Sequence, residues 1–122
     1  MPSVVIVGAS ADRRKFGNKA VRAFLKRGYR VIPVNPSETE IEGLKAYASV
    51  LEVPGEVGLA SLYVPVSIGR AVVEELARKG IREVWLNPGA HSPELIEQAR
   101  ALGLIPVVTC SIRRIGEVPE AY

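Results

Sequence analysis

The sequence contains one cysteine and one histidine in 122 residues, and aromatic residues make up only 6% of the chain. A single thiol, Cys110, excludes an intramolecular disulfide and a cysteine-rich zinc site. No apolar run reaches the roughly 20 residues that a membrane-spanning helix needs. The opening Met-Pro-Ser-Val-Val lacks the basic stretch that precedes the apolar part of a secretory signal. These absences predict a cytoplasmic protein that does not enter a membrane.

A strong excess of one charge is also lacking. The chain has 16 basic and 13 acidic residues, for a net charge of +3. This mild bias does not indicate a nucleic-acid partner. Apolar residues make up 48% and charged residues 24%, the balance of a folded protein with a substantial core. The length suits one compact domain, which we expect over residues 1–122 with a tail from about residue 111.

Short β-branched runs alternate with helical patterns along the chain. The apolar run at residues 4–7 is typical of a strand buried on both faces. Further strands are predicted at residues 29–34, 59–64, 83–86 and 104–109, and helices at residues 17–27, 67–79 and 92–102. Residues 45–47 and 49–53 carry weaker signals for a short extended piece and one helical turn. Five strands alternating with helices predict an α/β fold, a single Rossmann-like domain with a doubly wound parallel sheet.

Some residues carry specific local expectations. Ser67 is the predicted N-cap of the second helix, and Ile68 is predicted to face the core. Leu25 is predicted to do the same on the first helix. Pro33 cannot donate a hydrogen bond to a neighbouring strand, so we expect it at the end of its strand or beside a bulge.

The loop from Gly8 to Gly17 is the strongest candidate for a binding site. It joins the first buried strand to a helix, where free backbone N–H groups and the positive helix end converge. Gly8 allows a tight turn, Ser10 adds a hydroxyl, and residues 13–15 are Arg-Arg-Lys. A solvated basic loop with a structural glycine is the alternative. The position after the first strand of a parallel sheet favours phosphate binding.

A dinucleotide fingerprint is missing from this loop. The pattern Gly-x-Gly-x-x-Gly does not occur there. A ribose-binding acid is also expected about 20 residues further on, but the second strand ends in Val34-Asn35-Pro36, with no carboxylate until Glu38. These departures disfavour NAD and favour a ligand with more phosphate.

An ordered set of short motifs resembles the CoA-binding domain family. The motifs are Val7-Gly8-Ala9-Ser10, Lys15-Phe16-Gly17, the stretch from Gly28 to Pro36, and Leu62-Tyr63-Val64-Pro65. The same pattern opens the alpha subunit of succinyl-CoA synthetase and the acyl-CoA synthetases that form a nucleoside diphosphate. The resemblance extends from Val4 to about Cys110, and the chain is most similar in form to small, single-domain CoA-binding proteins.

The resemblance implies a Rossmann fold that binds coenzyme A or an acyl-CoA at the carboxyl ends of its strands. It implies that Gly8, Ala9 and Ser10 contact the phosphates or ribose, and that Arg13 and Lys15 neutralise phosphate charge, including the 3′-phosphate. The other implied contacts border the adenosine end, wall the cleft and line the pantetheine path: Val34, Asn35 and Pro36; Tyr63, Val64 and Pro65; and Leu86, Asn87, Pro88 and Gly89.

The resemblance also argues against catalysis. The large synthetases use a phosphorylated histidine in a second domain and a nucleotide-grasping domain, and 122 residues hold neither. His91 does not match that histidine, and we expect it to be a solvent-facing residue rather than a proton carrier. Cys110 is expected to be a partly buried, inert thiol rather than one that forms a mixed disulfide with CoA. No metal site is predicted.

Two other functions stay open at this point. One is an enzyme that uses NAD(P) or another nucleotide, and the other is a scaffold module whose cleft is vestigial. A protein partner or a homo-oligomer is compatible with each reading, but the sequence locates no interface.

Overall fold

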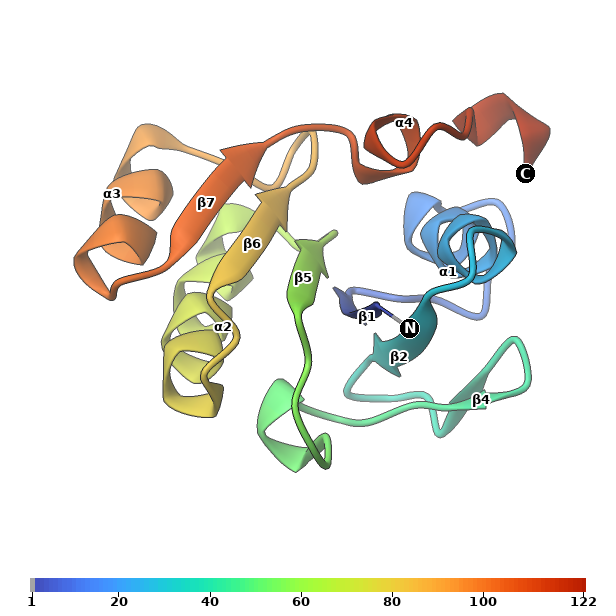
Figure 1. The fold of residues 1–122 in the computed structure, drawn as a ribbon, viewed down its shortest axis with the longest axis horizontal. Coiled ribbons are helices and arrows are strands. Elements are labelled where there is room, and N and C mark those ends of the chain that lie inside the picture. Colours follow the sequence, from blue (N-terminus) through green and yellow to red (C-terminus); the bar gives the residue numbers. More distant parts are fainter. Residues whose placement is uncertain (1) are drawn as a thin grey trace.

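The structure, a computed structural model that describes residues 2–122, is built around a five-stranded parallel sheet (Figure 1). Its strands are β1 (Ser3–Val7), β2 (Arg30–Val34), β5 (Leu59–Leu62), β6 (Glu83–Leu86) and β7 (Ile105–Val108). Their order in space is β2-β1-β5-β6-β7. The chain therefore reverses direction across the sheet between β1 and β5, and the ligand sites of doubly wound sheets lie at such a reversal. The predicted fold class is confirmed.

Strand β1 is central because its side chains suit burial on both faces. Residues 4–6 are completely buried and Val7 nearly so. β1 pairs with β2 on one side and β5 on the other. Pro33 lies inside β2, opposite Ile6, so the expectation that it ends the strand or marks a bulge is wrong. The sheet tolerates it because β2 is an edge strand, where one side of the backbone needs no strand partner.

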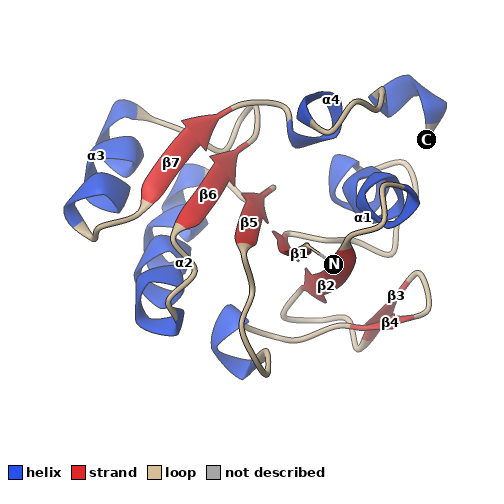
Figure 2. Ribbon diagram, in the orientation of Figure 1, coloured by secondary structure: helices blue, strands red, loops and turns tan. Residues whose placement is uncertain are grey.

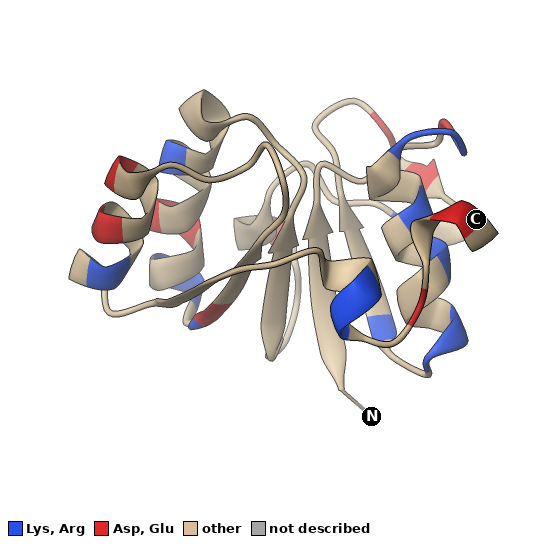
Figure 3. Cartoon of the chain, turned by 90° about the horizontal axis from the view of Figure 1, so that it is seen from above, with Lys and Arg blue, Asp and Glu red and all other residues tan. Residues whose placement is uncertain are grey.

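Helices cover both faces of the sheet, giving three layers that are clear in Figure 3. Helix α1 (Phe16–Lys26) and the short α4 (Ser111–Arg114) pack on one face. Helices α2 (Val66–Lys79) and α3 (Pro93–Ala101) pack on the other. Each face therefore has its own apolar core, one around Phe24 and one around Leu76.

The start of α3 agrees with the sequence prediction, and the start of α2 differs from it. Helix α3 begins as expected, because the Ser92 Oγ accepts the Leu95 N–H at 3.1 Å. Helix α2 has Pro65, not Ser67, as its N-cap. The exposed side of this helix carries Ile68, which is 52% exposed. Leu25 on α1 is 39% exposed, so both predicted core positions are wrong.

The connection from β2 to β5 contains no α-helix, and the short blue coil that precedes β5 in Figure 2 is a 3₁₀ turn. The connection forms a small hairpin, β3 (Glu40–Ile41) and β4 (Leu44–Lys45), followed by the 3₁₀ turn η1 (Val50–Glu52). The turn expected at residues 49–53 is confirmed, and its N-cap Ser49 accepts the Leu51 N–H. η1 packs against α2.

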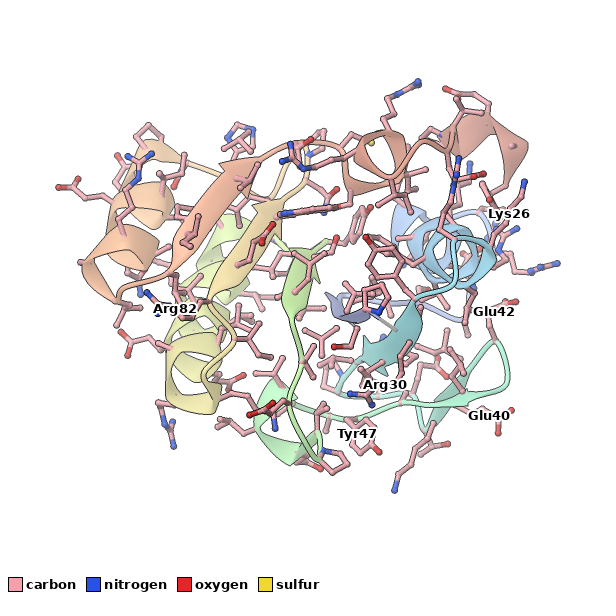
Figure 4. The ribbon with its side chains drawn as sticks, viewed as in Figure 1. Lys26, Arg30, Glu40, Glu42, Tyr47 and Arg82 are labelled. Atoms are coloured by element: carbon pink, nitrogen blue, oxygen red, sulfur yellow. The ribbon has the colours of Figure 1, made fainter. Side chains whose placement is uncertain are left out.

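Residues 111–122 fold back onto α1 rather than trailing into solvent. They form α4 and the 3₁₀ turn η2 (Pro119–Ala121). Glu117 holds this segment through ion pairs with Lys26 and Arg27 of α1 and a 2.6 Å hydrogen bond from the Tyr122 hydroxyl. Lys26 is labelled beside the segment in Figure 4. The sequence shows no periodicity here because these turns are too short to have one.

No helix within residues 2–122 combines the length and the apolar character needed to cross a bilayer.

Candidate functional site

A cavity of about 430 Å³ lies beyond the carboxyl ends of the central strands. Its walls come from the loops that follow β1, β2, β5 and β6. The lining residues are Gly8, Ala9, Ser10, Lys15, Phe16, Gly17, Asn35, Tyr63, Val64, Pro65, Pro88, Gly89 and Ala90. We call this space the loop cavity. It brings together ten of the residues named from the sequence, and Phe16, Gly17 and Ala90 are additions.

Gly8 fixes the place where the chain leaves β1. Its φ is +89°, a conformation that side chains with a Cβ rarely adopt. A Cβ there would lie 2.5 Å from the carbonyl oxygen of Tyr63. The Gly8 N–H donates to the Val34 oxygen at 3.1 Å. Gly8 therefore joins the ends of β1, β2 and β5 at one point.

Gly17 lets the start of α1 lie directly against this turn. A Cβ on Gly17 would collide with the carbonyl oxygen of Gly8. The two ends of the Gly8–Gly17 loop are thus in contact. A larger residue at either glycine would open the loop and displace the helix start from the strand end.

Two asparagines hold the loop by its carbonyl groups. The Asn18 amide donates to the Ser10 oxygen at 2.9 Å, and the Asn35 amide donates to the Ala9 oxygen at 2.8 Å. Asn18 is completely buried. Its role was not predicted, although an asparagine three residues before Val21 on the same helix face is a signal for a buried amide. The carbonyl groups of Ala9 and Ser10 are therefore already paired.

Several backbone N–H groups of the loop, in contrast, lack a hydrogen-bond partner. Within residues 2–122, no acceptor is recorded for the backbone N–H groups of Ala9, Ser10, Phe16 and Gly17. All four residues line the loop cavity. Helix α1 has no side-chain cap and no acidic residue in its first turn, so its positive end is not neutralised locally. Such an arrangement suits an anion.

Ser10 adds a hydroxyl donor to this set. Its Oγ accepts the Asp12 N–H at 3.0 Å. That contact uses a lone pair and leaves the hydroxyl hydrogen available to a ligand.

The three cationic side chains of the loop differ in whether they form ion pairs. Arg14 is bound to Asp12 at 3.0 Å, and this contact lowers the pKa of the Asp12 carboxyl to about 2. Arg13 pairs with Glu42 at 3.3 Å and does not line the cavity. Glu42 reaches α1 from the β3–β4 hairpin (Figure 4). Lys15 lines the cavity and has no ion pair within residues 2–122. The predicted contribution of Arg13 is therefore not supported by its position.

Two smaller cavities adjoin the loop cavity on opposite sides. One, of about 230 Å³, shares Gly8 and Val64 with it and is also lined by Val34 and Pro36. We call it the upper cavity. The other, of about 110 Å³, shares Phe16, Tyr63 and Pro88 with the loop cavity and is completed by Asn87 and Cys110. We call it the thiol cavity.

Tyr63 stands between the loop cavity and the thiol cavity. Its hydroxyl is buried and has no hydrogen-bond partner within residues 2–122. The nearby hydroxyls of Ser61 and Ser111 are bonded to each other at 2.7 Å. Burial, with a smaller contribution from Cys110, raises the pKa of the Tyr63 phenol far above its usual range. The group is therefore a protonated donor without an acceptor.

Asn87 and Leu86 are both engaged in contacts within the protein. The Asn87 amide donates to the Ser61 hydroxyl and the Leu62 oxygen, and its oxygen accepts the Ser111 N–H. Asn87 thus ties α4 to the sheet rather than offering free groups. Leu86 is completely buried in the core under α2 and α3, and it lines none of the three cavities. Its position does not match the predicted pantetheine contact.

Neither His91 nor Cys110 lines the loop cavity. His91 is exposed, just before the N-cap of α3. Cys110 is a half-buried free thiol. Residues 2–122 contain no group of three or more metal-ligating side chains that could hold an ion.

Comparison with known proteins identifies the family. A family model described as a CoA binding domain matches residues 2–114. The chain belongs to the CoA-binding domain family. The resemblance drawn from the motifs is confirmed.

Relatives of this CoA-binding domain include larger proteins and small ones. The alpha subunit of acetate–CoA ligase [ADP-forming] I from Pyrococcus furiosus is 40% identical in a match that covers 84% of this chain and 26% of that subunit. The subunit of isoenzyme II from the same organism is 39% identical, with 66% of this chain and 18% of the subunit covered. The chain thus matches only about a quarter or less of these relatives' length.

Solved structures show the same two settings. A conserved hypothetical protein from Pyrococcus furiosus superposes with a TM-score of 0.87 at 34% identity, covering 93% of this chain and 99% of that one. An acetyl-coenzyme A synthetase from Candidatus Korarchaeum cryptofilum superposes with a TM-score of 0.77 at 28% identity, covering 87% and 25%. The fold therefore occurs both as most of a small protein and as one part of a synthetase.

Proposed function

We propose that this chain binds coenzyme A or an acyl-CoA, without catalysis, at the carboxyl ends of its parallel strands. The phosphates lie in the loop cavity against the Gly8–Gly17 loop. The observation that carries the proposal is the set of unpartnered N–H groups at Ala9, Ser10, Phe16 and Gly17, with the free Lys15 beside them.

The three adjoining cavities fit the three parts of coenzyme A. The pyrophosphate belongs in the middle, where N–H donors and Lys15 surround the loop cavity. The upper cavity, beside Val34 and Pro36, takes the adenosine end. The thiol cavity, with a mainly apolar lining, takes the pantetheine end. A flexible ligand matches this sequence of chambers when its phosphates, the 3′-phosphate included, stay near Lys15 and its adenine base and pantetheine arm occupy the two side chambers.

The orphan hydroxyl of Tyr63 supports the same assignment. A buried donor without a partner costs about 1–3 kcal/mol. The pantetheine arm carries two amide carbonyls, and one of them can accept this hydrogen bond once a small movement of Tyr63 opens its hydroxyl, which is sealed in the free chain, to the thiol cavity. Asn87 stands beside the same chamber but keeps its role as a structural clamp.

Binding without catalysis is supported by the chemistry of the lining. Lys15 and Tyr63 are the ionisable side chains of the loop cavity. The raised pKa of Tyr63 keeps the phenol protonated at neutral pH, so it cannot act as a general base. Lys15 at the helix start is placed to neutralise phosphate rather than to attack a carbonyl.

Isothermal titration calorimetry of the folded chain with CoA, acetyl-CoA and NADH tests the proposal. We expect heat with CoA and with its acetyl ester, and weaker binding of NADH. Tighter binding of NADH would favour a nucleotide-dependent enzyme. No binding of CoA or acetyl-CoA by the folded chain would contradict the proposal and leave a scaffold module. The Ser10→Ala variant should bind CoA about tenfold more weakly, the cost of a charge-assisted hydrogen bond.

A further inference from the structure

The upper cavity has an unusual lining for a space next to a phosphate site. Its walls are the ends of β1 and β2, the first turns of α2, and the 3₁₀ turn η1. The lining residues are Val7, Gly8, Val34, Pro36, Ala48, Ser49, Val50, Val64, Ile68, Val72 and Glu75. Nine of these eleven have no polar side-chain atom. The exposure of Ile68 is explained by this position, since it covers the cavity rather than the core.

The two polar side chains of this lining are Ser49 and Glu75, and together they leave the carboxylate of Glu75 as the acceptor. The Ser49 Oγ accepts the Leu51 N–H and donates its own hydrogen to Glu75 Oε1 at 3.3 Å. The Ser49 hydroxyl hydrogen is therefore used. Glu75 has no ion pair, and Ser49 is its single side-chain hydrogen-bond donor within residues 2–122. The side chain is half-buried, so its second carboxylate oxygen is an acceptor at the edge of an apolar chamber.

An apolar chamber with one anionic acceptor suits a flat ring that carries an N–H donor. The adenine base of CoA has such a group, the exocyclic amine, on a flat aromatic ring whose two faces can pack against apolar side chains. A phosphate or a carboxylate would be repelled by Glu75. The pantetheine arm has amide N–H groups but ends in a thiol, and the thiol cavity receives it on the other side of the loop cavity.

We infer that Glu75 accepts a hydrogen bond from the exocyclic amine of the adenine base and so makes the site selective for 6-amino over 6-oxo purines. This inference rests on the proposed binding of CoA. A 6-oxo base would direct a carbonyl oxygen at the carboxylate, and two facing acceptors repel each other. Rejection of the wrong base therefore comes from an unpaired, repelled group as well as from a lost bond.

The test compares CoA with its deaminated analogue, in which hypoxanthine replaces adenine. The unsubstituted chain should bind CoA at least about tenfold more tightly in calorimetry at pH 7. In Glu75→Gln, the amide can rotate to present either a donor or an acceptor. This variant should bind the two compounds within about threefold of each other. Glu74→Gln is the matched control, because Glu74 is an exposed neighbour on the same helix, and it should keep the full preference.

The outcomes separate this inference from the proposed function. Equal binding of CoA and the analogue by the unsubstituted chain would overturn the role of Glu75 and leave CoA binding intact. A preference that persists in Glu75→Gln would also overturn it. Failure of both compounds to bind would instead contradict the proposed function. The comparison in the unsubstituted chain decides the matter even if Glu75→Gln is unstable in thermal unfolding.

Discussion

Each end of the sheet has a cavity, and the two cavities differ in whether their polar groups already have partners within the protein. The loop cavity at the carboxyl ends measures about 430 Å³. A second cavity at the amino ends is larger, about 560 Å³, and includes Lys79 and Gly80 in its lining. Lys79 donates hydrogen bonds to the carbonyl oxygens of Val53 and Gly55. Lys15, at the carboxyl end, has no ion pair within the described residues.

Volume therefore does not favour the carboxyl-end cavity as the proposed binding site, because the amino-end cavity is the larger of the two. What distinguishes the carboxyl end is the combination of free N–H groups at the start of a helix with a lysine that makes no ion pair within the described residues. The loop carbonyls of Ala9 and Ser10 are bound by two asparagine side chains, while the N–H groups of the same residues are free. At the amino end, the cation has already been used to hold the loop before β5 in place.

The largest expected effect comes from substituting one glycine in the lining of each cavity, Gly8 at the carboxyl end and Gly80 at the amino end. Gly8 and Gly80 have nearly the same backbone conformation, φ +89° and +90°. Alanine at either costs about 1–2 kcal/mol, because an L side chain disfavours this region. Gly8→Ala also places a Cβ against the Tyr63 carbonyl, whereas nothing lies within 4 Å of a Cβ on Gly80. We expect Gly8→Ala to be clearly less stable than Gly80→Ala and to lose CoA binding.

Thermal unfolding and calorimetry on the same two variants provide the measurement. Gly80→Ala should lower the melting temperature by roughly 3–8 °C and keep its affinity for CoA. Equal effects of the two variants on stability and on binding would remove the distinction between the two ends.

A smaller effect is expected from the lysines. Lys15→Ala should weaken CoA binding by about tenfold, because it removes one charge-assisted contact with phosphate. Lys79→Ala should leave CoA affinity unchanged and reduce stability, because it leaves the carbonyls of Val53 and Gly55 without their donor. Arg13→Ala serves as a control within the loop, since Arg13 pairs with Glu42, and its effect on affinity should be well below that of Lys15→Ala. If Arg13→Ala instead had the larger effect, the assignment of Lys15 would be wrong.

The smallest effect concerns the C-terminal segment, which lies outside the three cavities. The hydrogen bond from the Tyr122 hydroxyl, together with Arg27 and Lys26, lowers the pKa of Glu117. Because the carboxyl pKa is lowered, the contact stabilises the segment fully at pH values above 4.5, the ordinary pKa of a glutamate side chain. This stabilisation is lost as the pH falls through the lowered value. The protection of residues 111–122 from hydrogen exchange, measured relative to the intrinsic exchange rate at each pH, should therefore decrease at acid pH.

Glu117→Gln is the control for this pH dependence, because the amide cannot ionise. Its segment should exchange at a rate that changes much less with pH, after correction for intrinsic exchange. A wild-type segment that shows no greater acid sensitivity than Glu117→Gln would rule out the ion pairs as its anchor.

The order of strands and helices could be predicted because each buried strand is a local, β-branched run. The place of the candidate site was predicted from topology together with the composition of the loop, since a loop after the first strand of a doubly wound sheet lies at the reversal point. Pro33 was misplaced because edge position is a property of the whole sheet. The start of α2 was misplaced because Pro65 and Ser67 are both acceptable near a helix start.

Parts of the site could not be predicted because they depend on contacts between distant residues. Arg13 is neutralised by Glu42, 29 residues away on a hairpin with no strong sequence signal. Asn87 had a plausible position in a strand-end loop, but its polar groups are used by Ser61, Leu62 and Ser111. Glu75 enters the upper cavity only because η1 packs against α2. Sequence spacing contains none of this information.

The most direct test of the central claim follows backbone amide NMR signals during a titration with CoA. The account predicts the largest ¹H and ¹⁵N shifts at Ala9, Ser10, Phe16 and Gly17, whose N–H groups are free in the structure. Gly55 and Gly80 at the amino end should hardly move. Saturating CoA that leaves the four loop amides unchanged, or that shifts the amino-end glycines instead, would contradict the claim that the Gly8–Gly17 loop holds the phosphates.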